Sequence, residues 1–341
     1  MTRGCELSVV VPAFEEAECL GHALEIIAAH CRALTDDFEI VVVDDGSSDG
    51  TWAELESRAG SLRELRAVRL SRNFGKEAAL FAGLAEAGGS AVVVMDADLQ
   101  HPPALLGVFY RLWKSAAADV VEGVKRSRTR EPLLRRLFSS VFNRLLTLLT
   151  GCDFRGNSDF NLLDRRVVDT LLRMPERRSF FRGMVGWLGF RHYRIEFDVE
   201  PRQEGISRWG TIALIRLAGR AVVSYSGVPL RLIHIAAGGF LLMASSVGAR
   251  SLWLYVTGAA IGGFMTVILL LLVLGALVLL SLGVIAEYLG AIYEEAKGRP
   301  RYLISQRLCS QEFCAAGQIA NLAGALDTPH SALSREQTRT P

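Results

Sequence analysis

The segment Phe264–Ala286 is almost purely apolar, and no other feature restricts the fold of this chain so strongly. A helix needs about 20 apolar residues to cross a bilayer, and backbone polar groups in lipid must be satisfied within the segment itself. A second apolar segment runs from Leu232 to the region of Arg250–Leu254. It contains small residues that suit helix contact in lipid, Gly238, Gly239, Ser245 and Ser246. The sequence therefore predicts a two-helix transmembrane hairpin over 231–288, whose small residues also permit a homo-oligomer.

Positive charge predicts the orientation of the hairpin. The segment after the second span carries Lys297, Arg299, Arg301 and Arg307, whereas the connection between the spans offers only Arg250. The positive-inside rule then places both termini in the cytoplasm of an integral protein of the inner or plasma membrane. The net charge of the whole chain is only +2, so no global field favours a nucleic-acid partner. The six cysteines include no Cys-x-x-Cys pair, and we expect reduced thiols.

The N-terminal part alternates apolar runs typical of buried strands with segments of helical spacing. Strands are predicted at Leu7–Val11, Glu39–Val43, Arg66–Leu70, Ala91–Met95 and Val120–Val124. Helices are predicted at Glu16–Ala33, at Glu77–Ala87 and after Pro102-Pro103. This alternation predicts an α/β fold with a mostly parallel sheet and flanking helices. Ligands of such sheets bind beyond the carboxyl ends of the strands.

Two further segments, Leu133–Leu149 and Trp209–Ser226, have amphipathic helical spacing. Such spacing fits either core packing or a position at the membrane interface. The predicted organisation is an α/β domain over 1–208, an amphipathic juxtamembrane helix over 209–230, the hairpin over 231–288 and a cytosolic tail over 289–341. We expect the tail to be disordered beyond about residue 309.

Two carboxylates one residue apart, Asp96 and Asp98, follow the predicted strand Ala91–Met95. Alternate residues of an extended backbone project to the same side, so the two side chains can converge. Ionised carboxylates at close range repel each other. Mg²⁺ or Mn²⁺ removes that conflict, since such ions sit on one or two carboxylates plus substrate phosphates. Taken alone, the pair could also be two solvated loop acids.

Four motifs occur in a fixed order along the chain. They are Leu7-Ser8-Val9-Val10-Val11-Pro12, Val43-Asp44-Asp45-Gly46-Ser47-Ser48-Asp49-Gly50-Thr51, Ser71-Arg72-Asn73-Phe74-Gly75-Lys76-Glu77-Ala78 and Met95-Asp96-Ala97-Asp98-Leu99-Gln100-His101-Pro102-Pro103. This combination resembles the family 2 glycosyltransferases, which have a Rossmann-like GT-A fold. Arg202-x-x-Gly205-x-Ser207-Arg208-Trp209 and the paired spans resemble the branch of dolichyl-phosphate mannose synthases and bacterial polyprenyl-phosphate glycosyltransferases. The resemblance covers roughly residues 6–305.

The resemblance implies an inverting transfer of one hexose from a UDP- or GDP-sugar to a polyprenyl phosphate. On the donor side it implies metal ligands at Asp96, Asp98 and Gln100, and a nucleoside pocket lined by Pro12, Phe14, Glu16, Asp44 and Asp45. Turn formation with Gly46 is an alternative role for one of the two acids in the pocket. Lys76 would approach a phosphate or would simply be exposed. Arg202, with Ser207, would reach the donor phosphates from a mobile lid, or Arg202 would lie at the membrane surface.

On the acceptor side, the resemblance implies contacts to the lipid phosphate from Lys125, Arg126, Arg135 and Ser139. Asp159 would orient the attacking phosphate oxygen or accept its last proton. Its alternative role is that of a structural acid paired with Arg165 or Arg166. A phosphate monoester is already anionic near neutral pH, so the attack needs no strong base.

The sequence departs from the family pattern at three positions. Phe14-Glu15 replaces the common Tyr-Asn, Asn161 stands where a basic residue often follows Asp-Phe, and Arg208 replaces the usual lysine. Two competing functions are a processive polysaccharide synthase and a non-catalytic membrane protein that binds a sugar nucleotide or lipid phosphate. Against the first, Gln203 and Arg208-Trp209 are spaced too far apart for a Gln-x-x-Arg-Trp motif. Against the second, Asp96, Asp98 and Arg202 are all present.

Overall fold

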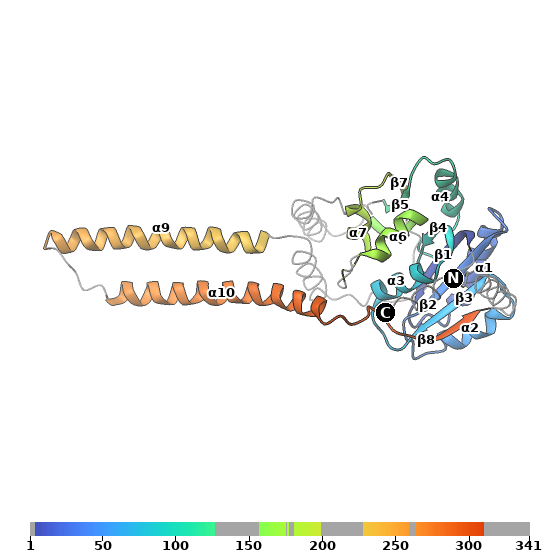
Figure 1. Cartoon of the computed structure of the whole chain (residues 1–341), viewed down its shortest axis with the longest axis horizontal. Helices are drawn as coiled ribbons and strands as arrows, with labels where there is room; N and C mark the ends of the chain where they lie inside the picture. The colour runs from blue at the N-terminus through green and yellow to red at the C-terminus, as the bar shows by residue number, and fades with distance from the viewer. Residues whose placement is uncertain are drawn as a thin grey trace, which may run out of the picture.

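A computed structural model describes residues 4–126, 157–174, 176, 181–198, 228–258 and 264–309 of the chain. Within these residues one sheet of eight strands has the order β7-β5-β6-β4-β1-β2-β3-β8 (Figure 1). The strands are β1 (Cys5–Ala13), β2 (Phe38–Asp44), β3 (Leu65–Leu70), β4 (Gly89–Val94), β5 (Val120–Lys125), β6 (Asn157–Asp164), β7 (His192–Phe197) and β8 (Ile304–Cys309). The four strands β4, β1, β2 and β3 are parallel. The predicted mostly parallel α/β fold is therefore confirmed.

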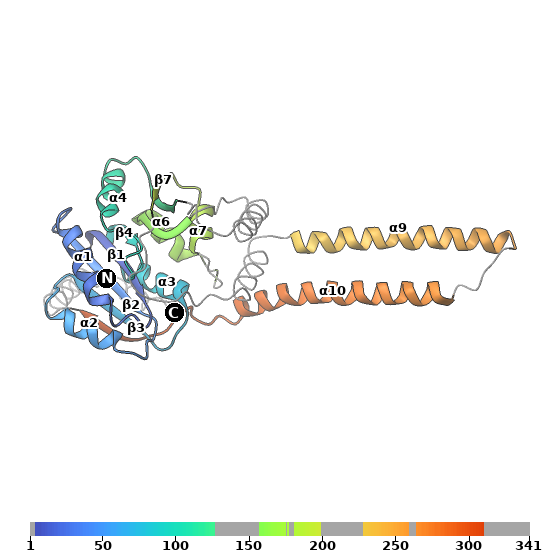
Figure 2. The same cartoon turned by 180° about the vertical axis from the view of Figure 1, so that it is seen from behind.

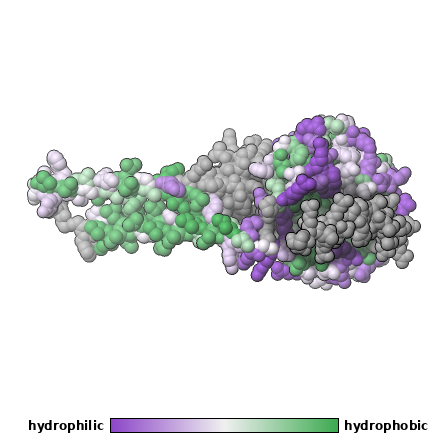
Figure 3. Space-filling model, viewed as in Figure 1, coloured by the Kyte–Doolittle hydropathy of each residue, from purple (hydrophilic) through white to green (hydrophobic). Residues whose placement is uncertain are grey.

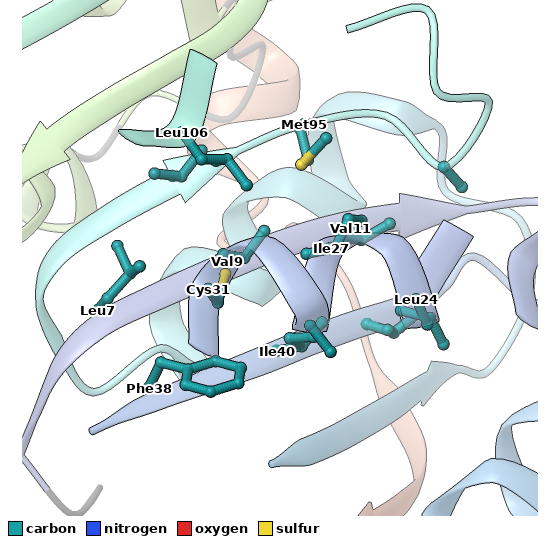
Figure 4. Close-up of a cluster of buried hydrophobic side chains, with 14 of the residues drawn as sticks. Leu7, Val9, Val11, Leu24, Ile27, Cys31, Phe38, Ile40, Met95 and Leu106 are labelled. Atoms are coloured by element: carbon teal, nitrogen blue, oxygen red, sulfur yellow. The ribbon is translucent and has the colours of Figure 1, made fainter. Parts of the chain in front are cut away.

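Helices cover both faces of the sheet. They are α1 (Leu20–Arg32), α2 (Thr51–Ala59), α3 (Lys76–Glu86), α4 (Leu105–Lys114), α6 (Arg165–Arg173) and α7 (Phe181–Trp187). Successive residues of a strand face opposite sides, and β1 shows the consequence. Val9 and Val11 pack against α1 and the residues around it (Figure 4), whereas Val10 packs with α3, α6 and α7 on the other face. An uninterrupted apolar strand is thus buried on both sides.

Two antiparallel strands that the sequence analysis did not predict complete the sheet near its centre and at one edge. β6 pairs antiparallel with both β4 and β5, and β8 pairs antiparallel with β3. β7 was also not predicted, and it pairs parallel with β5. The first predicted helix begins at Leu20 rather than at Glu16, because the carbonyl of Glu16 accepts the amides of Cys19 and Leu20 in a preceding turn.

Two long helices, α9 (Val228–Val256) and α10 (Phe264–Ala296), project together from the sheet domain (Figures 1 and 2). By length and composition, Leu232–Val256 and Thr266–Ala296 could each cross a membrane. Apolar side chains cover much of this pair, whereas the visible face of the sheet domain is rich in hydrophilic residues (Figure 3). The pair matches the predicted hairpin, and α10 extends beyond the predicted limit at Ala286. The predicted amphipathic helices and the tail beyond residue 309 lie outside the described residues.

After α10 the chain returns to the sheet domain. The amide of Ser71, just past β3, donates to the carbonyl of Leu303 at 2.8 Å. Arg307 of β8 forms an ion pair with Glu86 of α3 at 2.9 Å, and the guanidinium of Arg301 lies 4.5 Å from the ring centre of Phe81. These contacts attach the segment that follows the second apolar helix to β3 and α3.

The cysteines only partly match the expectation of reduced thiols. Cys5, Cys19 and Cys31 are free, whereas Cys309 at the end of β8 is disulfide-bonded. The prediction is wrong for Cys309.

Candidate active site

The carboxyl ends of the parallel strands place several predicted residues at one edge of the sheet. Ala13 of β1 is in register with Asp44 of β2, and Asp45 follows directly. The amide of Met95 continues the pairing of β4 with β1 by donating to the carbonyl of Val10 at 3.1 Å. Asp96 therefore begins its loop directly beyond β4, beside the end of β1. Within the described residues, this edge gathers the acids that the sequence singled out.

His101 supports the Asp96–Asp98 loop through a hydrogen bond. The backbone amide of Asp96 donates to Nδ1 of His101 at 3.2 Å. The imidazole is buried, and its ring stacks on Phe160 with centroids 5.0 Å apart and meets Phe197 edge-on. Burial lowers the pKa of His101 to about 4, so the ring is neutral and Nδ1 can accept. The sequence analysis quoted His101 within a motif but gave it no role.

Asp98, the second acid of the pair, accepts a hydrogen bond from within its own loop. Asp98 Oδ1 accepts the amide of Gln100 at 3.1 Å, and the intervening Leu99 has a positive φ of 54°. A side chain in this left-handed conformation is strained, and such strain is characteristic of functional loops. The carboxylate oxygens of Asp96 and Asp98 and the side-chain oxygen of Gln100 are hard donors that fit Mg²⁺ or Mn²⁺. Among the described residues, no three His, Cys, Asp or Glu side chains form a group that could hold a metal ion by themselves.

Lys76 bridges two acids from different parts of the chain. Its ammonium lies 2.6 Å from Oδ1 of Asp96 and 2.7 Å from Oδ2 of Asp159. Burial by itself would lower the pKa of Lys76, but the two carboxylates outweigh burial and raise it. Lys76 is thus a charged member of the site, although its side chain remains 45% exposed. The expectation that it would be merely exposed does not hold.

Asp159 of β6 is also paired with Arg182 of α7, a residue that the sequence analysis did not single out. Arg182 donates from Nε to Oδ1 at 2.7 Å and from Nη2 to Oδ2 at 3.0 Å. Burial would raise the pKa of Asp159, but Arg182 and Lys76 outweigh it and hold this pKa well below its usual range.

The predicted partners of Asp159 were wrong. Arg165 lies against Asp169 and the carbonyl of Ala87, and Arg166 pairs with Asp119 and Asp164.

Asp45 fixes the turn that leads into Lys76. Its two carboxylate oxygens accept the amides of Phe74 and Gly75, each at 2.8 Å. Gly75 has a φ of 96°, which favours glycine, and α3 begins at the next residue. Burial raises the pKa of Asp45, and the two amides act in the opposite direction. Asp45 therefore has a structural role in addition to any contact with a nucleoside.

Asp44 and the residues after β1 frame the predicted nucleoside side. Oδ1 of Asp44 accepts the amide of Ser47 at 2.9 Å, which is the predicted turn. Its buried Oδ2 lies 3.2 Å from Nε of Arg69 but makes no hydrogen bond within the described residues. Pro12 lies within β1, and Phe14 is one of the exposed large apolar residues. Glu16 accepts a hydrogen bond from the thiol of Cys19 at 2.8 Å.

Lys125 at the end of β5 differs from Arg126, the other predicted acceptor contact that the structure describes, because Arg126 is paired with acids. Its side chain has no hydrogen bond or ion pair within the described residues. Burial lowers its pKa, Asp96 raises it, and Arg182 and Lys76 lower it further, which places Lys125 within electrostatic reach of all three. Arg126 instead pairs with Glu196 at 3.4 Å and with Asp198 at 3.2 Å. The predicted residues Arg135, Ser139, Arg202 and Ser207 lie outside the described residues.

Comparison with known proteins identifies the family. Residues 8–172 match the model of glycosyl transferase family 2. The chain is 37% identical over 303 residues to an uncharacterized glycosyltransferase of Synechocystis sp., with 88% of this chain and 95% of that protein covered. This chain belongs to glycosyl transferase family 2. It is also 33% identical to the bactoprenol glucosyl transferase of Shigella phage SfX, with 89% of this chain and 99% of that protein covered.

Among solved structures, glucosyl-3-phosphoglycerate synthase from Mycobacterium tuberculosis in complex with phosphoglyceric acid is similar at a TM-score of 0.43 and 21% identity. The match covers 65% of this chain and 80% of that one. The predicted family is confirmed by the family model and the sequence relatives.

Proposed function

We propose that this glycosyltransferase moves one hexose from a nucleotide diphosphate sugar to a polyprenyl phosphate, with inversion at the anomeric carbon. The observation that carries the proposal is the cluster of Asp96, Lys76, Asp159 and Arg182, with Lys125 close by, in a chain that also has two apolar helices of membrane-spanning length. The similar phage protein is named a bactoprenol glucosyl transferase, which supports a lipid phosphate as acceptor.

The donor would bind at the ends of β1, β2 and β4. Asp96, Asp98 and Gln100 would hold Mg²⁺ or Mn²⁺, which would supply charge neutralisation for the departing nucleotide diphosphate. Oδ2 of Asp44 accepts no hydrogen bond within the described residues, although it lies beside Arg69, and this supports a contact to a nucleoside N–H or hydroxyl, with Pro12, Phe14, Glu16 and Asp45 around it. Lys76 would stabilise charge on a donor phosphate, and Arg202 with Ser207 would contact the diphosphate from the lid.

The acceptor would bind on the β5–β6 side. Lys125 offers an ammonium without a partner in the described part of the chain, and such a charge favours a phosphate ligand. Arg126, Arg135 and Ser139 would complete the phosphate contacts. The acceptor oxygen would attack the anomeric carbon directly, on the side opposite the leaving diphosphate, and would thereby invert the configuration. Asp159 would serve this step by orienting the nucleophile or by taking up a proton.

The reaction would take place at the cytosolic face of the inner or plasma membrane. The two apolar helices support an integral membrane protein, and the cations that follow α10 support cytoplasmic termini. Small residues in α9 are compatible with a homo-oligomer.

The full chain, purified in lipid nanodiscs that contain undecaprenyl phosphate, tests the proposal. It is incubated with a panel of UDP- and GDP-sugars and Mn²⁺, and lipid products are identified by mass spectrometry. One product that carries a single hexose is expected, and Asp98→Ala serves as the negative control. A ladder of products would indicate a processive synthase, and folded protein that gives no sugar-lipid with any donor would refute the proposal.

A further inference from the structure

The carboxylate of Asp159 is fully engaged by two cations. Arg182 bonds to both oxygens at 2.7 and 3.0 Å, and Lys76 reaches Oδ2 at 2.7 Å. The carboxylate is nearly inaccessible, since only 7% of the side chain is exposed. A planar guanidinium that bonds both oxygens occupies the two directions from which a carboxylate most readily takes up a proton. Within this arrangement, the carboxylate oxygens of Asp159 offer little accessible surface to a proton of the acceptor phosphate.

We propose that Asp159 is a positioning residue that holds Lys76 and Arg182 in place, and that no proton is transferred to it during the reaction. This inference rests on the proposed function. Among the roles that the sequence leaves open for Asp159, it selects that of a structural acid, with Lys76 and Arg182 as its partners. The low pKa of Asp159 agrees with it, because an effective general base has a pKa near the working pH.

The chemistry of the proposed reaction does not require a base. The second ionisation of a phosphate monoester has a pKa of about 6, so most of the acceptor is a dianion at neutral pH. One of its oxygens forms the new bond to the anomeric carbon. The bond from that carbon to the diphosphate oxygen breaks, and its electron pair leaves with the nucleotide diphosphate. The acceptor loses one negative charge and the leaving group gains one, so the total charge is balanced without a proton.

The elements around Asp159 show what it positions. Lys76 is the first residue of α3, and Arg182 is the second residue of α7. The residue after Lys76, Glu77, accepts the first amide of α7, that of Phe181, at 2.8 Å. The starts of α3 and α7 are thus joined to each other directly and to β6 through Asp159. Since Lys76 also contacts Asp96, this unit links the acceptor side of the site to the predicted metal loop.

Removal of the Asp159 charge alone would leave Lys76 and Arg182 close together without their shared counter-ion. An unpaired buried charge is strongly destabilising, whereas removal of both partners of a buried pair is often tolerated. A proton acceptor behaves differently, because removal of a neighbouring cation cannot replace a lost base. A double variant therefore separates the two roles.

The test compares Asp159→Asn with the double variant Asp159→Asn/Arg182→Gln, in which two amides can keep a neutral hydrogen bond. Turnover of a nucleotide sugar with undecaprenyl phosphate is measured in nanodiscs from pH 6 to 9. We expect the single variant to lose about 100-fold in kcat and the double variant to recover about tenfold of that loss. The pH profile of the double variant should keep the shape of the wild-type profile. Asp169→Asn is the control, because Asp169 is a surface acid of α6 paired with Arg165, and its activity should be unchanged.

The outcomes are distinct. A double variant no more active than Asp159→Asn, together with loss of an acidic limb that the wild type shows, would overturn the positioning role and assign a base. Wild-type protein that forms no sugar-lipid with any donor would instead overturn the proposed function, and with it the reaction in which Asp159 takes part.

Discussion

Deletion of residues 300–341 should destabilise the sheet domain, although the deleted segment follows both apolar helices in the sequence. The deletion removes β8, which pairs with β3 at five positions. The first pair is Arg66 with Cys309, and the last is Leu70 with Ile304. It also removes Tyr302, which packs against two buried clusters. β3 would then become an open edge of the sheet.

The size of the effect follows from these contacts. Five paired positions at about 0.5–1 kcal/mol of net hydrogen-bond stabilisation each give about 3–5 kcal/mol. Burial of the Tyr302 ring adds about 2 kcal/mol, and the conformational entropy of the ordered segment offsets part of the sum. We expect a net loss of about 3 kcal/mol, which for a domain of this size lowers Tm by about 10 °C.

The assay is thermal unfolding in detergent, followed by the fluorescence of tryptophans in the sheet domain such as Trp52 and Trp113. Deletion of residues 315–341 is the matched control, because it removes most of the predicted disordered tail and leaves β8 and every cysteine in place. Equal melting temperatures for the two truncated proteins would refute the structural role given to β8.

Three other perturbations give further tests. Burial raises the pKa of Glu77 from 4.5 to about 7. Because this carboxyl ionises at a lower pH in the unfolded chain than in the folded protein, the free energy of unfolding falls as pH rises between these values. Glu77→Gln should remove about 3 kcal/mol of that pH dependence, as measured by urea unfolding at pH 4.5 and 8. Asp45→Asn places a side-chain N–H opposite the backbone N–H of Phe74 or Gly75, in place of one charge-assisted hydrogen bond. The free energy of unfolding, measured without nucleotide, should fall by about 2–4 kcal/mol. Chelation of divalent ions, or Asp98→Ala, should lower turnover at least about 100-fold, and Mn²⁺ should restore only the chelated wild type.

The central strands could be predicted because their sequence leaves few alternatives. β1, β2 and β4 are buried on both faces, and their sequences therefore consist almost entirely of apolar residues. The position of Asp96 and Asp98 then follows from the direction of β4. The carboxyl-end rule for parallel sheets was sufficient to bring these acids near the end of β1.

β6 could not be predicted in the same way, because its polar residues are satisfied by distant partners. Ser158 donates to the carbonyl of Gly123 at 2.6 Å, and Asp159 is neutralised by Arg182 and Lys76. Each of these contacts depends on the tertiary fold, so the segment Asn157–Asp164 has no clear strand pattern of its own. The partners predicted for Asp159 were chosen by proximity along the chain, whereas its true partners come from α3 and α7.

His101 and Arg182 show two different limits of the sequence. His101 lies five residues after Asp96, and a histidine so close to the predicted metal motif was a usable signal for a residue that supports the loop. Arg182 lies 23 positions from its partner and follows a run of other arginines, so nothing local distinguishes it. A structure was needed to select it.

The return of the chain from α10 to the sheet also limits how far the site can lie from the end of this helix. Only residues 297–303 separate the end of α10 at Ala296 from the start of β8 at Ile304. Seven residues span at most about 24 Å when fully extended. Contacts of Arg301 with Phe81 and of Leu303 with Ser71 shorten the free part of this connection further. The β3 edge, and with it the turn that leads into Lys76, is therefore tied to the end of a membrane-length helix by a short connection. Under the proposed function, this attachment would keep the site close to lipid headgroups at the membrane surface.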